Sequence, residues 1–343
     1  MTNYAPFDTR PNFEATESDI SVALLTDHLN TTKSKLAKQI GKRGVMEVLG
    51  DMQLLVGPPE QLCISNAALM MFCEHLDKFF PYTQVEITKF PEGSIKNPNN
   101  FIEVPVIKGS VPTMIKRTME KLQDMVIEEK VTKVDYQMEA IRRYSYPYQA
   151  LEEAVVNAFY HRDYQSYQAI IIEIEPDCVR IISYPGIDRS ISQKTIAEGE
   201  RFKSRYYRNK RLGEFLKELD LTEGKSTGIP TIQEELRDNG SPKATFETDD
   251  ERRAVTVEIP IHPDFLMEQG EPQNEPQNEP QNATSVEDAI LQLIRMNKYV
   301  TREEMASQIE VSLSTVKRSI NKLKTSGIIE YEGPSKGGYW SIK

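Results

Sequence analysis

The sequence predicts an α+β protein in two folded parts, because three segments with different patterns follow one another along the chain. Residues 151–164 have the apolar spacing of a helix, and two Ile-rich runs with strand-like alternation come directly after it. Residues 271–282 repeat EPQN three times, and no core can form there because nothing apolar is present. The segment after the repeat predicts three short helices and two strands.

Helix and strand patterns alternate over the first 140 residues. We expect helices over 20–30 and 65–78 and a strand over 85–89. Ser110 can cap a third helix, because a helix-spaced apolar stripe follows it. This stripe consists of Met114, Ile115, Met119, Leu122, Met125 and Val126.

The segment Leu151–Tyr164 predicts a helix with two different faces. Glu153, Asn157 and His161 stand four apart and share a polar stripe. A carboxylate one turn from a carboxamide suits a magnesium–nucleotide site, because the carboxylate can activate water and the amide oxygen can hold the ion. The same spacing is common on solvated helices and by itself favours that ordinary reading. The apolar stripe beside it is Leu151, Ala154, Val155, Ala158 and Phe159.

Two runs, 169–175 and 178–183, predict a hairpin that turns at Glu175-Pro176-Asp177. An amphipathic helix over 207–219 then leads to the loop Thr222–Ile229. Two glycines around Lys, Ser and Thr ahead of a helix can present backbone N–H groups to phosphate, although such a loop is more often a plain turn and cap. The GxxxxGK[ST] spacing of a P-loop is absent.

Taken in order, these segments resemble the GHKL (Bergerat) ATPase fold of gyrase B, heat-shock chaperones, histidine kinases and mismatch-repair MutL. The closer resemblance is to a bacterial group of transcriptional regulators and helicase-related proteins, in which this module follows a Schlafen/Alba-type DNA-binding domain. The stretches that carry the resemblance are YPYQALEEAVVNAFYHRDY (146–164), SYPGIDRSI (183–191), YRNKRLGEFLKELDLTEGKSTGIPTI (207–232) and NGSPKATFETD (239–249).

The resemblance implies a Bergerat-type α/β sandwich that binds ATP and Mg²⁺. Glu153 matches the water-activating base, and Asn157 matches the asparagine that coordinates Mg²⁺. Gly186 matches the glycine beside the adenine, and Gly224–Gly228 match the lid over the phosphates. Arg208 can either reach a phosphate or sit in a solvated ion pair. The candidate nucleotide-binding residues are Asn157, Gly186, Arg208, Asn209, Gly224, Ser226, Thr227 and Gly228.

The sequence departs from the family pattern at the adenine site. Most members carry an aspartate two residues before the first glycine, and this chain has Tyr184 there, which cannot accept the adenine bond in the same geometry. Asp177 and Asp188 are near in sequence, with no sign that either substitutes. His161-Arg162-Asp163 resembles a kinase loop, but the other kinase motifs are missing, so His161 either assists at the nucleotide or pins the helix end.

The segment after the EPQN repeat resembles a winged helix-turn-helix. Thr301 and Glu304 form a capping box at its second helix, and a third helix over 314–326 buries Val316, Ile320 and Leu323. Its outward residues suit phosphates and base edges of double-stranded DNA, although a protein-binding winged helix is the alternative. These candidate DNA-binding residues are Ser314, Thr315, Lys317, Arg318, Asn321 and Lys322.

Composition and patterning predict four regions in a cytoplasmic protein. Three scattered cysteines suggest ordinary thiols in a reducing compartment, and no signal peptide or membrane-spanning run is present. A net charge of −10 argues against a globally basic coat and leaves room for a local basic surface. The match begins near residue 4, so we expect the Alba-type half to be missing, in a shortened member or a fragment. The regions are 1–140 (mixed α/β), 141–265 (GHKL-like), 266–283 (linker) and 284–343 (winged helix).

Two functional classes follow from these patterns. The first is a nucleotide-responsive DNA-binding protein, a transcriptional regulator whose module binds and slowly hydrolyses ATP, which Glu153 and Asn157 favour. The second is an inactive GHKL scaffold for oligomerisation or ligand sensing, which Tyr184 favours. A helicase is a poor fit because no P-loop motor is present. The expected partners are double-stranded DNA and an adenine nucleotide, with no membrane, and the sequence leaves a homo-oligomer open.

Overall fold

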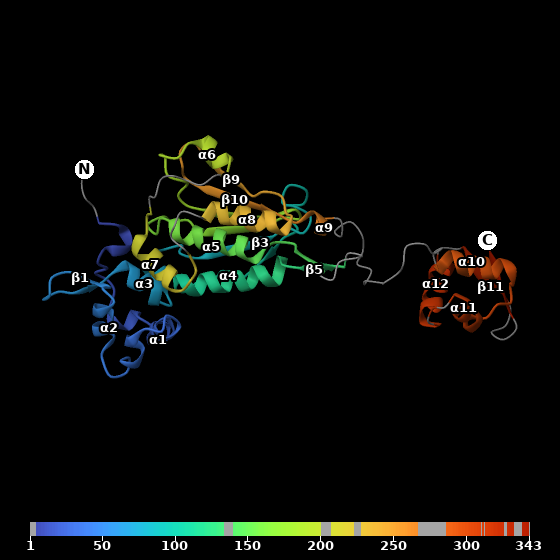
Figure 1. The fold of residues 1–343 in the computed structure, drawn as a ribbon, viewed down its shortest axis with the longest axis horizontal. Coiled ribbons are helices and arrows are strands. Elements are labelled where there is room, and N and C mark those ends of the chain that lie inside the picture. Colours follow the sequence, from blue (N-terminus) through green and yellow to red (C-terminus); the bar gives the residue numbers. More distant parts are fainter. Residues whose placement is uncertain are drawn as a thin grey trace. The chain divides into compact units, whose positions relative to one another are not determined.

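The computed structural model describes residues 5–133, 140–199, 207–222, 228–266, 286–309, 311, 313–325, 328–332 and 338–342. The chain divides into two compact units, Met1–Pro272 and Gln273–Lys343, and each has its own hydrophobic core. Figure 1 shows the helices and strands of both units. The fold is mixed α+β, as the sequence predicts.

A six-stranded sheet forms the centre of the first unit, in the order β4-β3-β7-β8-β10-β9. Among these strands β3 and β7 pair in parallel, and the other neighbours pair antiparallel. The strands are β3 (Val85–Lys89), β4 (Ile102–Glu103), β7 (Ile170–Ile174), β8 (Cys178–Ser183), β9 (Thr245–Thr248) and β10 (Val255–Pro260).

The hairpin of β7 and β8 confirms the alternation seen in the sequence. Ile172 pairs with Ile181, and both side chains are buried on one face of the sheet. Glu173 pairs with Arg180, and both are half-exposed on the opposite face. One face therefore packs on helices while the other remains partly open to solvent.

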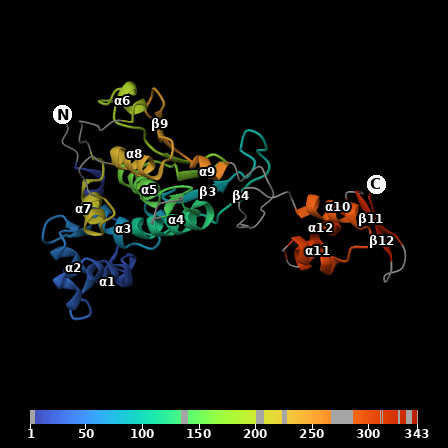
Figure 2. The ribbon, with the colours of Figure 1, turned by 45° about the vertical axis from the view of Figure 1, so that its right-hand side comes forward.

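Three helices, α4 (Val111–Val126), α5 (Tyr148–His161) and α8 (Gly228–Asn239), pack side by side against this sheet (Figures 1 and 2). The expected cap of α4 is confirmed, because Ser110 Oγ accepts a hydrogen bond from Thr113 N at 3.4 Å. All five residues of the expected α5 stripe are buried. The helix layer therefore arises from apolar stripes already visible in the sequence.

The first part of the chain packs around α7 (Lys210–Glu218). Asp8 Oδ2 accepts hydrogen bonds from the backbone N–H groups of Arg211 at 2.6 Å and Leu212 at 3.1 Å, which caps α7 from the far end of the sequence. The helix expected over 65–78 ends early, because Cys73 is extended. The elements here are η1 (Phe7–Thr9), η2 (Glu17–Asp19), α1 (Val22–Thr31), η3 (Lys35–Lys38), α2 (Val45–Asp51), β1 (Leu55–Val56), β2 (Cys63–Ile64), α3 (Asn66–Phe72) and η4 (Leu76–Lys78).

The predicted boundary near residue 140 does not separate two cores. Strand β3 from the first region pairs with β7 from the second, and one core extends from Ile20 to Phe265. Sequence patterns missed this because pairing between distant strands leaves no local mark. The first unit also contains β5 (Glu129–Thr132), β6 (Ile141–Tyr144), α6 (Gln193–Ala197) and α9 (Pro263–Leu266).

The second unit has the helix and strand order expected of a winged helix-turn-helix. The capping box is confirmed, because Glu304 N donates to Thr301 Oγ1 at 3.2 Å and Thr301 N donates to Glu304 Oε2 at 2.8 Å. Trp340 donates its indole N–H to Val300 O at 3.0 Å inside the core. The elements are α10 (Val286–Met296), α11 (Arg302–Ile309), α12 (Leu313–Thr325), β11 (Ile329–Glu332) and β12 (Tyr339–Ile342).

Candidate functional site

Glu153 and Asn157 lie next to each other on the half-exposed stripe of α5. Asn157 Nδ2 donates a hydrogen bond to Glu153 Oε1 at 2.9 Å, as the four-residue spacing leads one to expect. The bond occupies the amide nitrogen and leaves Asn157 Oδ1, the atom that a hard cation would select, outside it. The bond shows that the two side chains are in contact on one side of α5.

The N-terminus of α8 meets this pair. A Cβ on Gly228 would lie 2.5 Å from Asn157 Nδ2 and 2.6 Å from Glu153 Oε1, so any larger residue here would displace these two side chains. The first turn of a helix has N–H groups without partners inside the helix, and its dipole favours anions there. A carboxylate, a carboxamide and the N-terminal end of α8 are thus in close contact, and the carboxylate of this group, Glu153, also lines the neighbouring cavity. Gly224, Ser226 and Thr227 lie outside the described residues.

A cavity of about 450 Å³ opens beside Glu153, between α5, α7 and α8. Four carboxylates and one lysine line it, so a bare polyphosphate would be repelled and a metal-bound one tolerated. Burial raises the pKa of Glu152 against the opposing hydrogen bond from Tyr148. The lining residues are Gln149, Glu152, Glu153, Lys217, Asp220, Leu221, Thr222, Thr231 and Glu235.

Gly186 lies in a tightly packed turn just past the end of β8. A Cβ on this glycine would lie 2.3 Å from Thr248 Oγ1 and 2.6 Å from Ala254 O. Thr248 Oγ1 donates to Ala254 O at 2.6 Å, which places a hydroxyl beside Gly186. We did not select Thr248 from the sequence, although it belongs to the NGSPKATFETD stretch that carries the resemblance.

The two aspartates near Tyr184 in the sequence, Asp177 and Asp188, have different surroundings in the structure. Asp177 precedes β8, at the opposite end of the strand from Tyr184. Asp188 lies on the same side as Tyr184, but its carboxylate accepts a hydrogen bond from Ser190 N at 2.8 Å in its own turn. Bonds from Ser190, with the charges of Arg208 and Arg252, lower the pKa of Asp188. One carboxylate oxygen of Asp188 therefore anchors its own turn.

Asn209 is a structural residue in this fold, which corrects its assignment as a nucleotide ligand. The side chain is fully buried, and Nδ2 donates to Tyr160 O at 3.0 Å and Arg162 O at 2.7 Å. These carbonyls belong to the C-terminal end of α5, where they have no partner within the helix. Because both amide hydrogens are used inside the protein, Asn209 positions α5 and does not face a ligand.

Arg208 and His161 lie near each other at the end of α5. The rings of Tyr160 and Tyr207 stack on each other with centroids 5.3 Å apart, and the His161 ring lies against both, at 5.0 Å from Tyr160 and 6.0 Å from Tyr207. Although part of the residue is exposed, desolvation of the ring and the charge of Arg208 lower the pKa of His161. The ring contacts of His161 with Tyr160 and Tyr207 favour the role of pinning the helix end. Within the described residues Arg208 forms no ion pair and remains a candidate phosphate contact.

The His161-Arg162-Asp163 run builds the loop after α5. Arg162 is buried and donates to the carbonyls of Gln168 and Tyr82, the latter at 3.0 Å. Asp163 Oδ1 accepts a hydrogen bond from Gln165 N at 3.0 Å. These contacts give Arg162 and Asp163 a structural role in the loop after α5.

The candidate DNA surface lies on α12 of the second unit. Lys317 is exposed and Thr315 half-exposed, while Val316 and Ile320 face the core, as the spacing predicts. Helix α12 contains four basic and no acidic residues, in a chain of net charge −10. The side chains of Ser314, Arg318, Asn321 and Lys322 lie outside the described part of the structure, so their assignment stays a prediction.

Comparison with known proteins agrees with this architecture. Residues 168–258 match the family HATPase_c_4, whose description reads "Putative ATP-dependent DNA helicase recG C-terminal". Residues 286–339 match HTH_11, an HTH domain. No curated protein matches the chain.

One solved structure is similar to the whole chain. The crystal structure of the DIP2311 protein from Corynebacterium diphtheriae is 16% identical, with a TM-score of 0.57. The alignment covers 99% of this chain and 64% of that one, and at this identity the likeness shows the fold alone. Among the described residues no helix is long and apolar enough to cross a membrane. The chain has an ATPase-like domain followed by a C-terminal HTH domain.

Proposed function

We propose that the protein is a nucleotide-responsive DNA-binding regulator. A magnesium-bound adenine nucleotide would bind where Glu153 and Asn157 meet Gly228, and the HTH domain would bind double-stranded DNA. The convergence of a carboxylate, a carboxamide and a helix N-terminus carries this proposal. The ATPase-like and HTH matches support the combination of activities.

Each residue at the convergence has a chemical task in this proposal. Asn157 Oδ1 would hold Mg²⁺, which neutralises phosphate charge when bound. The N–H groups of the first turn of α8 would bind phosphate oxygens. Glu153 would accept a proton from an attacking water, giving slow hydrolysis. The described residues contain no group of three His, Cys, Asp or Glu side chains able to hold a metal, so the ion would share ligands with the phosphates.

An inactive scaffold is the second candidate, and Tyr184 favours it. The aspartate that would accept the adenine amino group in the resembling family is replaced by Tyr184 in this chain. The scaffold would keep the fold for ligand sensing or oligomerisation and leave DNA binding to the HTH domain. The resemblance to Schlafen/Alba-type regulators rests on the four motif stretches, and it is compatible with both candidate functions.

Titration calorimetry with ATP, ADP and GTP, with and without Mg²⁺, tests the proposal. We expect magnesium-dependent binding of the adenine nucleotides, and at least a tenfold loss in Asn157→Ala, because one bond to the ion is about 1.4 kcal/mol or more. Asn30→Ala, an exposed asparagine on α1, is the matched control and should bind like the wild type. Absence of binding at millimolar ATP and ADP would reject the nucleotide site, and equal binding of GTP would reject adenine specificity.

A further inference from the structure

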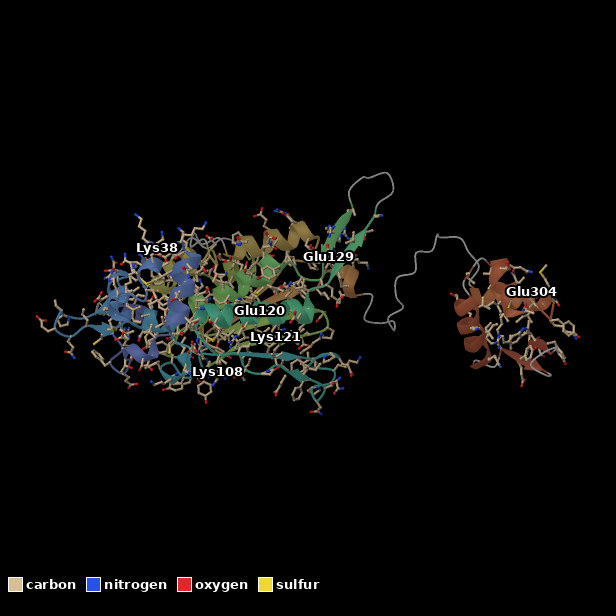
Figure 3. The ribbon with its side chains drawn as sticks, turned by 90° about the horizontal axis from the view of Figure 1, so that it is seen from below. Lys38, Lys108, Glu120, Lys121, Glu129 and Glu304 are labelled. Atoms are coloured by element: carbon tan, nitrogen blue, oxygen red, sulfur yellow. The ribbon has the colours of Figure 1, made fainter. Side chains whose placement is uncertain are left out.

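A cluster of lysines lies between α1 and α2, on the unit that carries the ATPase-like domain. Residues 32–44, here called the lysine segment, contain Lys33, Lys35, Lys38, Lys42 and Arg43 and no acidic residue. All four lysines are exposed, and Figure 3 shows Lys38 projecting outward from the N-terminal helices. In a chain of net charge −10, this is a local positive surface.

The lysine segment has a defined structure. Leu36 N donates to Ser34 Oγ at 3.3 Å, Gln39 N donates to Leu36 O at 2.8 Å, and Lys42 N donates to Gln39 O at 3.0 Å. Leu36, Ala37 and Ile40 pack against the core. Because residues three apart eclipse in a 3-10 helix, Lys35 and Lys38 stand on one side of η3, away from these apolar contacts.

Neighbouring carboxylates do not neutralise the four lysines. Arg43 bonds to Glu47 at 2.9 Å and Asp51 at 2.6 Å, so it engages two carboxylates of α2. None of the four lysines forms an ion pair with a described residue. The positive charge of the lysine segment is therefore directed to solvent.

We infer that the lysine segment binds the phosphate backbone of double-stranded DNA, as a second contact besides α12. Lysines on flexible stems suit sequence-independent contacts with phosphates, where charge matters more than fixed geometry. The apolar residues of the segment face the core, so it presents no apolar anchor to a bilayer, which an interfacial membrane site would need. The inference rests on the DNA-binding half of the proposed function and is independent of the nucleotide site.

Two DNA contacts in one chain have a measurable consequence. Once one contact is bound, the other binds intramolecularly at a high effective concentration, so the affinity exceeds that of either contact alone. Each phosphate contact also adds about 0.9 to the slope of log affinity against log salt concentration. Removal of the lysine charges should therefore lower the affinity of the chain for DNA and the salt dependence of that binding, whatever the DNA sequence.

The test is fluorescence anisotropy of duplex DNA with the full chain across a salt series. The first variant changes Lys33, Lys35, Lys38 and Lys42 to Gln. The control changes four dispersed exposed lysines, Lys96, Lys116, Lys121 and Lys243, to Gln, which gives the same change in net charge. We expect the first variant to lose roughly tenfold or more in affinity and to flatten the salt slope by about 2–4, and the control to change little. Equal losses in both variants would overturn the inference, because net charge alone would explain them.

A third variant separates this inference from the proposed HTH contact. It changes Lys317, Arg318 and Lys322 to Gln in the full chain. If this variant loses affinity while the lysine-segment variant binds like the wild type, the inference fails and the HTH contact stands. If only the lysine-segment variant loses affinity, the inference stands and the α12 assignment fails. Binding of the wild type to phosphatidylserine vesicles but not to DNA would overturn both and identify a membrane surface.

Discussion

Replacing Asn209 by alanine should lower the free energy of unfolding by about 2–4 kcal/mol, while the nucleotide affinity of the folded protein stays unchanged. The variant removes two donors from the buried carbonyls of Tyr160 and Arg162, and each unpaired carbonyl costs about 1–3 kcal/mol. Part of this cost is offset, because Asn209 Oδ1 is itself buried without a partner and disappears in the variant. If water hydrogen-bonds to these carbonyls in the variant, the loss in free energy of unfolding should be close to about 2 kcal/mol.

Urea unfolding followed by circular dichroism measures this loss, and calorimetry at low temperature measures nucleotide binding. Asn157→Ala is the matched control, because it is half-exposed and should cost little stability while weakening magnesium-dependent binding. In thermal unfolding, the midpoint temperature of the Asn209 variant should be roughly 5–15 °C lower than that of the wild type. An Asn209 variant with wild-type stability and lost nucleotide binding would refute this reasoning and restore Asn209 as a ligand.

Three further outcomes are expected. Glu153→Gln should keep nucleotide binding and lose about a hundredfold or more in ATP turnover, and an unchanged rate would assign Glu153 another role. Burial holds the pKa of His28 below its ordinary 6.5, against the opposing charge of Glu218. The unfolded state therefore binds a proton more readily than the folded state, and acid favours unfolding. Stability should fall as pH drops below about 6.5, and His28→Phe should reduce this slope in unfolding curves at several pH values. Asn321→Ala should alter the preference of the chain among DNA sequences by about 1–3 kcal/mol in competition gel shifts, whereas uniform weakening would make Asn321 a backbone contact.

Local patterns were sufficient for most helices and strands. The cap at Ser110, the capping box at Thr301 and the hairpin of β7 and β8 follow from residues within a few positions of one another. Capping, periodicity and turn chemistry are local effects, so a single sequence records them. The end of the predicted helix 65–78 was wrong, because the extended Cys73 leads into η4, and Leu76 becomes buried in the tertiary core.

Roles that depend on distant contacts were not readable from the sequence. Asn209 belongs to the motif stretch that carries the resemblance, yet its buried position shows that it holds the end of α5. No local pattern marks Asp8 as a helix cap, because the helix that it caps, α7, lies more than 200 positions further along the chain. A motif records which residues occur together and does not distinguish a ligand contact from a structural one.

The sequence by itself determined that Glu153 and Asn157 share one stripe of α5, because the helix period places residues four apart on the same side. It also determined that an HTH-like domain follows the EPQN repeat. Only the tertiary structure brought Gly228 onto the Glu153–Asn157 pair, joined β3 and β7 into one sheet, and turned Asn209 inward. Periodicity specifies which side of an element is buried, whereas the partner that buries it is chosen by packing of the whole chain.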